Sequence, residues 1–207
     1  MQHILDGYTA SATPDFVAAY DGLSPEAIYQ PVIDLFPPTP SRIADIGAGT
    51  GRDAAWLAAK GHTLVAVEPV AALREPGRHL HPSPAIEWLD DRLPTLDHLG
   101  RTHQKTPFNL ILLCAVWQHL DTPARARAIP AIAALLAPAG RLILSLRHGP
   151  GGIGRPVFAT SPGETITQAT DAGLTLLRCQ TSPAIQPANI ANGVHWTWLA
   201  FEVDQVI

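Results

Sequence analysis

Charged residues are scarce in this chain of 207 residues, and its lysines and arginines do not cluster. Asp, Glu, Lys and Arg together make up 15% of the sequence, against roughly 25% in an average soluble protein. The formal net charge is −4 at pH 7. A nucleic-acid-binding protein normally carries a basic patch, so this composition argues against a nucleic-acid partner and favours a small molecule.

Cysteine is almost as scarce, with two residues in the whole chain. Cys114 and Cys179 lie in apolar stretches typical of strands, which favours buried reduced thiols over a disulfide or a metal pair. His79 and His81 are closely spaced, but no third or fourth ligand lies near them in the sequence. We therefore expect no metal site.

Long uninterrupted apolar runs are also missing. The longest candidate, residues 128–146, contains two prolines and an arginine and is therefore not expected to span a bilayer. The N-terminal residues lack the basic start and apolar core of a signal peptide. These features predict a cytoplasmic protein without a membrane partner. The oligomeric state cannot be read from the sequence.

The most informative segment is Ile43-Ala44-Asp45-Ile46-Gly47-Ala48-Gly49-Thr50-Gly51-Arg52-Asp53. It runs from a short apolar strand through a glycine-rich turn into a predicted helix. Glycine permits positive φ angles and removes the Cβ that would keep a ligand away from the main chain. The free N–H groups at the start of the helix favour a carboxylate or a phosphate. The pattern therefore predicts a nucleotide-binding turn.

This segment resembles the first motif of class I S-adenosylmethionine-dependent methyltransferases, an acidic residue followed by three alternating glycines. Asp45, Gly47, Gly49 and Gly51 match it, and the resemblance extends over nearly the whole chain. It implies S-adenosyl-L-methionine as cofactor and a Rossmann-like fold. The dinucleotide fingerprint Gly-x-Gly-x-x-Gly is the competing interpretation, but its third glycine would fall on Arg52.

The alternation of apolar strands and helical segments predicts an α/β fold: a three-layer α/β/α sandwich with a mostly parallel seven-stranded sheet and an antiparallel C-terminal strand. We expect a single methyltransferase domain over residues 1–207, in which residues 1–40 form an N-terminal helical cap or lid. The last two strands have no helix predicted between them and should pair antiparallel. The predicted strands are 42–46, 63–68, 86–89, 108–114, 141–146, 174–180 and 194–203, and the predicted helices that follow the first strand are 51–60, 71–80, 94–99, 122–140 and 161–172, with a polar loop at 98–106.

Acidic residues end the first three predicted strands. Ligands of such sheets bind beyond the carboxyl ends of the strands, so these acids are candidate cofactor ligands. Glu68 is placed to accept both ribose hydroxyls, and the resemblance implies that Asp45 contacts the methionine part and that Asp90 or Asp91 accepts from the adenine amino group. The full predicted cofactor set is Asp45, Gly47, Ala48, Gly49, Gly51, Arg52, Asp53, Glu68, Pro69, Asp90, Asp91 and Ala115.

Candidate acceptor-binding residues follow the fourth and fifth predicted strands and begin the last one. Histidine titrates near neutral pH, and His119 and His148 are therefore the predicted base or orienting groups. Tryptophan offers a flat apolar face for an aromatic molecule. The predicted substrate-binding set is Tyr20, Trp117, Arg147, His148, His195 and Trp196.

The expected reaction is transfer of a methyl group to an oxygen or nitrogen atom of a small aromatic or heteroaromatic molecule. The segment after the fourth strand is not the Asn/Asp-Pro-Pro-aromatic turn of enzymes that methylate amino groups of bases or of glutamine. Two interpretations remain beside this one. The first is a nicotinamide-dependent oxidoreductase, although the sequence has no Tyr-x-x-x-Lys pair. The second is a non-catalytic module that binds S-adenosylmethionine.

Overall fold

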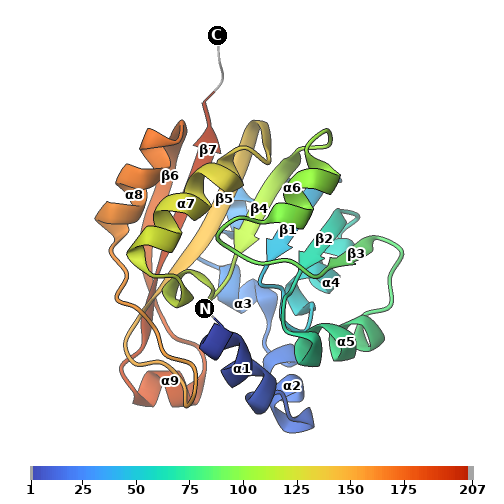
Figure 1. Cartoon of the computed structure of the whole chain (residues 1–207), viewed down its shortest axis with the longest axis vertical. Coiled ribbons are helices and arrows are strands. Elements are labelled where there is room, and N and C mark those ends of the chain that lie inside the picture. Colours follow the sequence, from blue (N-terminus) through green and yellow to red (C-terminus); the bar gives the residue numbers. More distant parts are fainter. Residues whose placement is uncertain (1, 205–207) are drawn as a thin grey trace.

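The computed structural model describes residues 2–204 and contains one mixed β-sheet (Figure 1). Seven strands lie in the order β3-β2-β1-β4-β5-β7-β6, in which β7 runs antiparallel to both of its neighbours. The predicted α/β class and antiparallel C-terminal strand are thereby confirmed. The strands are β1 Arg42–Ile46, β2 Thr63–Val67, β3 Ile86–Leu89, β4 Phe108–Leu113, β5 Leu136–His148, β6 Leu174–Pro183 and β7 His195–Val203.

Helices cover both faces of the sheet and the carboxyl ends of its parallel strands (Figure 1). Several begin where the sequence offers a cap: the Ser161 hydroxyl accepts the N–H of Glu164 at the start of α8, and Ser24 caps α3 in the same way. The helices are α1 Gln2–Ser11, α2 Pro14–Asp21, α3 Pro25–Tyr29, α4 Arg52–Ala58, α5 Ala71–Leu80, α6 Asp97–His103, α7 Thr122–Ala133, α8 Pro162–Asp171 and α9 Pro187–Ala191, with 3-10 turns η1 Ile33–Leu35 and η2 Trp117–His119.

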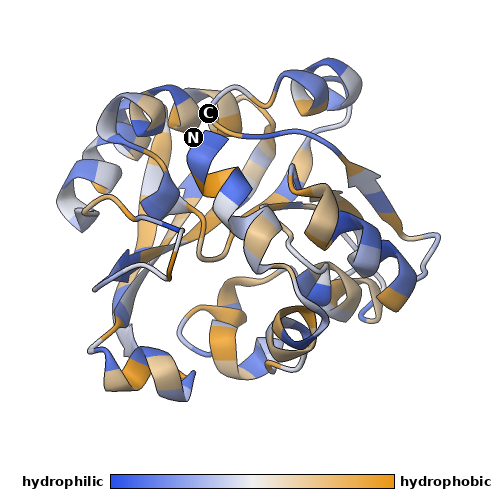
Figure 2. Ribbon diagram, turned by 60° about the horizontal axis from the view of Figure 1, so that its bottom comes forward, coloured by the Kyte–Doolittle hydropathy of each residue, from blue (hydrophilic) through white to orange (hydrophobic). Residues whose placement is uncertain are grey.

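Two apolar cores lie on opposite faces of the sheet. Even-numbered residues of β5, such as Leu144, pack beneath α6, α7 and α8, whereas Ile143 faces α3, η1 and α4. Successive side chains of a strand point to opposite faces, and the central strands are buried on both. Figure 2 shows these strands in the colours of hydrophobic residues between helices of mixed character. Because of this alternation, only every second residue of β5 faces the functional site.

A third, smaller core joins the N-terminal helices to α5. Val17 of α2 packs with Val70 and Leu73, and Leu5 and Tyr8 of α1 lie against the same cluster. In Figure 1, α1 and α2 lie near the carboxyl ends of the parallel strands, beside α5. None of the helices among residues 2–204 combines the length and apolar character needed to cross a membrane.

The segment between α7 and β5 differs from the prediction. The helix ends at Ala133 and the strand already begins at Leu136, not at residue 141. Leu136 pairs with Phe108, and a Cβ at Gly140 would lie 2.8 Å from the Phe108 carbonyl oxygen. The alanine-rich sequence suits a helix, but pairing with β4 takes precedence over its helical propensity.

Two further predictions were wrong in detail. The segment 98–106 is not a loop, because α6 runs from Asp97 to His103. The carboxylate of Asp91 accepts the N–H groups of His98 and Leu99 and so caps this helix from a distant position. The short helix α9, Pro187–Ala191, lies between β6 and β7, where no helix was predicted. Five residues are too few to show helical periodicity.

Candidate functional site

The glycine-rich turn after β1 brings bare backbone to the edge of the sheet. Gly47 and Ala48 donate their N–H groups to the carbonyl of Val67 at 2.8 and 3.0 Å. Gly47 has φ +77°, and a Cβ there would lie 2.4 Å from Val116. A side chain at this position would therefore meet both an unfavourable backbone conformation and a steric clash.

Glu68, directly after β2, links this turn to the next one. Its Oε2 accepts the N–H of Gly49 and its Oε1 accepts the N–H of Val70, both at 2.8 Å. Burial raises the pKa of Glu68 to about 7, although these two hydrogen bonds act in the opposite direction. The carboxyl group is therefore close to its titration point at neutral pH.

Asp45 is a buried carboxyl group with one unpaired oxygen. Among residues 2–204, nothing donates a hydrogen bond to its Oδ2. Burial raises the pKa of Asp45 well above its usual range, and the negative charge of Asp53 adds to the effect. Buried polar atoms in native proteins are normally satisfied, so an orphaned acceptor beside a glycine-rich turn fits the site of a cationic ligand group.

Arg52 and Asp53 begin α4 and neutralise each other. Two guanidinium nitrogens of Arg52 donate to the two carboxylate oxygens of Asp53 at 2.7 and 2.8 Å. The hydroxyl of Tyr29 donates to Asp53 at 2.8 Å, and Arg52 donates to the carbonyl of Tyr20. This network leaves Asp45 as the unpaired acid of the group.

Two cavities meet at the carboxyl ends of the strands. The larger has a volume of about 1100 Å³ and the smaller about 120 Å³. The smaller one is lined by Glu68, Pro69 and Asp91, and by side chains of α1. The larger one is lined by Ala48, Arg52 and Asp53, and by residues of β5 and β7. The two cavities share seven lining residues: Tyr8, Tyr20, Gly47, Gly49, Cys114, Ala115 and His119.

Three predicted cofactor ligands line neither cavity: Asp45, Gly51 and Asp90. Asp45 lies in β1, directly before the glycine-rich turn. Gly51 packs against the ring of Trp88, where a Cβ would approach within 2.5 Å, and its left-handed backbone starts α4. Asp90 is largely exposed and pairs with Arg74 at 3.0 Å. Asp91 lines the smaller cavity, but its carboxylate caps α6. The predicted adenine contact therefore stays open between Asp90 and Asp91.

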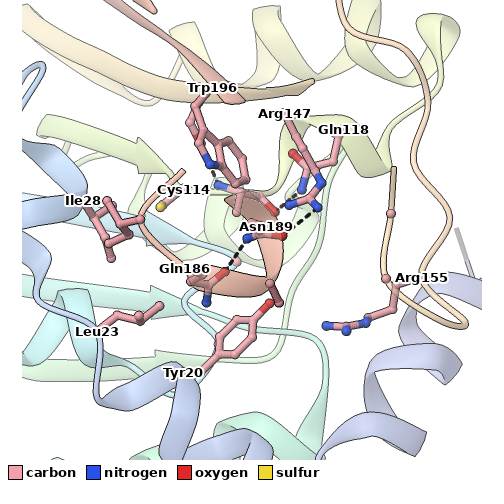
Figure 3. Close-up of a pocket in the computed structure, with 18 of the residues that line it drawn as sticks. Tyr20, Leu23, Ile28, Cys114, Gln118, Arg147, Arg155, Gln186, Asn189 and Trp196 are labelled. Atoms are coloured by element: carbon pink, nitrogen blue, oxygen red, sulfur yellow. Dashed lines mark hydrogen bonds between the residues drawn. The ribbon is translucent and has the colours of Figure 1, made fainter. Parts of the chain in front are cut away.

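Strand alternation separates the candidates on β5 and β7. Arg147 and Trp196 are cross-strand partners and line the larger cavity (Figure 3). His148 and His195, the next pair, point to the other face, where the rings stack 4.7 Å apart and His148 contacts the Thr197 hydroxyl at 2.9 Å. Contrary to expectation, these histidines line neither cavity, because neighbouring residues of a strand face opposite ways.

Trp117, which was expected to bind the substrate, also lies away from both cavities. Its side chain is fully buried in the core beneath α7 and α8, and its indole N–H donates to the hydroxyl of Thr165 at 3.2 Å. The following residue, Gln118, lines the larger cavity instead. Because the segment forms a 3-10 turn, the aromatic residue points inward and the amide faces the cavity.

His119 borders both cavities and is held from two sides. Its Nδ1 lies 3.2 Å from the carbonyl oxygen of Pro156, and its Nε2 lies 2.9 Å from the hydroxyl of Tyr8. A carbonyl only accepts, so Nδ1 carries the proton and Nε2 accepts. Burial lowers the pKa of His119 to about 4, and the imidazole is therefore neutral at pH 7.

Polar residues of the site that the predicted set lacks include Tyr8, Gln118 and Arg155. Arg155 lies in the loop after β5, and its guanidinium lies 5.1 Å from the ring centre of Tyr8. Hydrophobic periodicity does not show where a loop residue lies, nor that an N-terminal helix packs over the cavity. Residues 2–204 contain no cluster of three or more His, Cys, Asp or Glu that could hold a metal ion.

The comparisons with known proteins agree with this architecture. A family described as "Methyltransferase domain" matches residues 21–178. Proteins from Mycobacterium bovis and Mycobacterium tuberculosis, each named an uncharacterized methyltransferase, are 30% identical over 131 residues, which are 61% of this chain and 48% of theirs. The chain thus spans about half the length of these curated relatives.

Solved structures show the same fold. The 1,6-didemethyltoxoflavin-N1-methyltransferase of Burkholderia thailandensis has a TM-score of 0.70 at 20% identity, over 97% of this chain and 88% of that one. A TehB-like SAM-dependent methyltransferase of Corynebacterium glutamicum has a TM-score of 0.65 at 18% identity, over 96% and 100%. The chain belongs to the family of methyltransferase domains, as its resemblance predicted, and it shares the fold of solved S-adenosylmethionine-dependent methyltransferases.

Proposed function

We propose that this chain transfers the methyl group of S-adenosylmethionine to an oxygen or nitrogen atom of a small aromatic or heteroaromatic molecule. The observation that carries the proposal is the pair of adjoining cavities at the glycine-rich turn. One lies beside Glu68, and the other extends to Trp196 and Tyr20. This arrangement supports a cofactor and an acceptor bound end to end at the carboxyl edge of the sheet.

The buried groups fit the cofactor. The unpartnered oxygen of Asp45 suits the ammonium group of the methionine part, and the carboxylate of Glu68 suits the ribose hydroxyls. When bound, S-adenosylmethionine supplies an activated methyl carbon, so the protein mainly has to align the acceptor. The Burkholderia structure contains 1,6-didemethyltoxoflavin and S-adenosylhomocysteine, which supports a small-molecule acceptor here.

Calorimetric titration with S-adenosylmethionine, S-adenosylhomocysteine and NADH tests the proposal. We expect the first two to bind and NADH not to bind. Binding of NADH alone would favour the oxidoreductase interpretation. A protein that binds the first two but methylates no compound in a broad acceptor screen would instead be the non-catalytic module.

His119 and His148 should differ sharply when replaced by alanine. His119 lies at the junction of the two cavities, where its neutral Nε2 accepts from the hydroxyl of Tyr8 and so orients that hydroxyl beside a bound acceptor. We expect His119→Ala to lower kcat about tenfold, the loss of one positioning hydrogen bond. His148→Ala should leave kcat within about twofold, because its ring faces away from the cavity. Steady-state rates with an acceptor from the screen decide this, and equal effects would contradict it.

We also propose that residues 1–40 act as a lid over the cofactor. Ile4, Leu5 and Tyr8 of α1 line the smaller cavity. Gly7 packs so closely on the loop after β5 that an added Cβ would lie 1.9 Å from the carbonyl oxygen of Gly154. The lid is therefore held by a contact that only glycine allows.

Gly7→Ala should displace α1 and speed dissociation of S-adenosylhomocysteine about tenfold, at a stability cost of about 1–3 kcal/mol. Stopped-flow tryptophan fluorescence measures the rate. Gly100→Ala in α6 is the matched control, because its added Cβ meets no atom within 4 Å. Equal dissociation rates for both variants and the native protein would argue against a lid.

A further inference from the structure

Arginines dominate the charge of the larger cavity. Of the described residues that line it, Arg52, Arg147 and Arg155 are cationic and Asp53 is the one carboxylate. Arg52 and Asp53 form a two-point ion pair, so their charges cancel. His119 is neutral at pH 7, since burial lowers its pKa to about 4. The remaining charge is that of Arg147 and Arg155.

Neither of these two arginines has a carboxylate partner among residues 2–204. Arg147 donates to the carbonyl of Pro150 at 2.8 Å and to the amide oxygen of Asn189 at 3.0 Å, both neutral acceptors. Arg155 lies over the rings of Tyr8 and Phe16, and its buried Nε makes no hydrogen bond. A half-buried cation without a counter-charge is costly, and an anion from outside would relieve that cost.

The guanidinium groups of Arg147 and Arg155 both line the larger cavity. They extend from different segments, β5 and the loop after it, into the same pocket (Figure 3). The positive charge of each lowers the pKa of His119. Trp196 provides a flat wall beside Arg147, with its ring centre 5.5 Å from the guanidinium carbon. Anion recognition and an aromatic surface therefore meet in the acceptor half of the site.

Gln118 adds a third element of recognition. Its side chain is almost fully buried and lines the same cavity. The amide nitrogen donates to the carbonyl of Ala115 at 2.6 Å, whereas no group in the described part of the chain donates to the amide oxygen Oε1. An unsatisfied acceptor in this position suits the O–H or N–H of a bound molecule.

We propose that the methyl acceptor is a planar aromatic carboxylate, with its anionic group bound by Arg147 and Arg155 and an O–H or N–H donated to Gln118. Guanidinium groups bind carboxylates through paired N–H donors, which gives both orientation and charge neutralisation. The inference rests on the proposed methyl transfer, because it assigns the larger cavity to the acceptor. It identifies Arg147 and Arg155 as residues that determine specificity.

Matched acid and amide probes test this. Protein saturated with S-adenosylhomocysteine is titrated with 4-hydroxybenzoate against 4-hydroxybenzamide, nicotinate against nicotinamide, and phenyl phosphate. We expect at least one acid to bind about tenfold or more tightly than its amide. Arg147→Gln and Arg155→Gln should each remove this preference, and Arg155→Lys should retain part of it. Arg178→Gln, on β6 and paired with Asp34, is the control that leaves the preference intact.

The outcomes separate this inference from the proposed function. If S-adenosylhomocysteine does not bind, the methyltransferase proposal fails. If it binds but the acids bind no better than the amides, or none binds, the carboxylate assignment alone is overturned. A preference for phenyl phosphate over 4-hydroxybenzoate overturns it as well. If Arg147→Gln and Arg155→Gln weaken S-adenosylhomocysteine itself, the two arginines serve the cofactor's carboxylate and not the acceptor.

Discussion

Replacing Asp45 with asparagine should make the ligand-free protein more stable and, at the same time, weaken its binding of the cofactor at least tenfold. The buried Oδ2 of Asp45 has no hydrogen-bond partner within residues 2–204, and both burial and the nearby Asp53 oppose the ionisation of this carboxyl group. Asparagine has similar size and no charge, so we expect the free energy of unfolding at pH 7 to rise by about 1 kcal/mol. Denaturant titration measures this difference.

The sign follows from proton linkage. The pKa of Asp45 is raised in the folded state, so the folded protein binds this proton more tightly than the unfolded chain does. This contribution is fully present below the unfolded pKa of about 3.9 and is lost as the pH rises through the folded pKa. The native protein and Asp45→Asn should therefore be closest in stability at acidic pH and furthest apart at neutral pH.

Cofactor binding should change in the opposite direction. A charge-assisted hydrogen bond to a desolvated ammonium group contributes about 1.5–3 kcal/mol, which corresponds to roughly 10- to 150-fold in Kd. Calorimetry with S-adenosylhomocysteine, which keeps that ammonium group, measures the loss. Unchanged affinity would remove Asp45 from the cofactor site.

Asp53→Asn is the matched control, because the same chemical change occurs in a satisfied carboxylate. Asp53 accepts from Arg52 and Tyr29, and the loss of its charge leaves the largely buried guanidinium of Arg52 without a counter-charge. We expect a stability loss of about 3 kcal/mol, in contrast to the gain for Asp45→Asn. Two neighbouring acids would then show opposite effects, and a loss for both would contradict the assignment of Asp45 as unpaired.

The parts of the fold that the sequence predicts best are those in which local pattern and tertiary packing agree. Strands β1 to β4 are short, predominantly apolar segments, and the capping residues before α3 and α8 are visible in the sequence. The start of β5 was missed because the alanines and leucines of residues 134–137 favour a helix locally, while pairing with Phe108 makes Leu136 part of the sheet. Such long-range pairing is absent from any local window.

The site divides in a similar way. Residues tied to the glycine-rich turn could be found from spacing, since their positions follow from the chain direction. On β5, the alternation of side chains predicts that Arg147 and His148 face opposite sides of the sheet. It does not predict which side holds the site. That choice depends on which residues of the strand pack under α7, as Leu144 and Leu146 do. Gln118 and Arg155 lie in a turn and a loop, where no period exists to place them.

Glu68→Ala should produce the largest loss of cofactor affinity. The substitution removes the proposed ribose acceptor and also the two hydrogen bonds that join the glycine-rich turn to the turn after β2. Loss of two charge-assisted bonds corresponds to about 3–4 kcal/mol, or a few hundredfold in Kd. Glu68→Gln keeps the shape and one carbonyl acceptor, so its loss should be nearer tenfold.

The pH dependence of binding tests the same carboxylate without removing it. The pKa of Glu68 is about 7 in the free protein, and the ionised form accepts hydroxyl donors at both oxygens and attracts a cationic cofactor. Binding should therefore lower this pKa and release a proton, so affinity rises with pH between about 5.5 and 7.5 and then levels off. His119, with a pKa of about 4, titrates below this window. In Glu68→Gln the rise should be much reduced, with Asp45 as its remaining source, because amides do not titrate. An equally steep rise in the variant would show that another group carries the proton, and would separate the ribose role of Glu68 from its structural one.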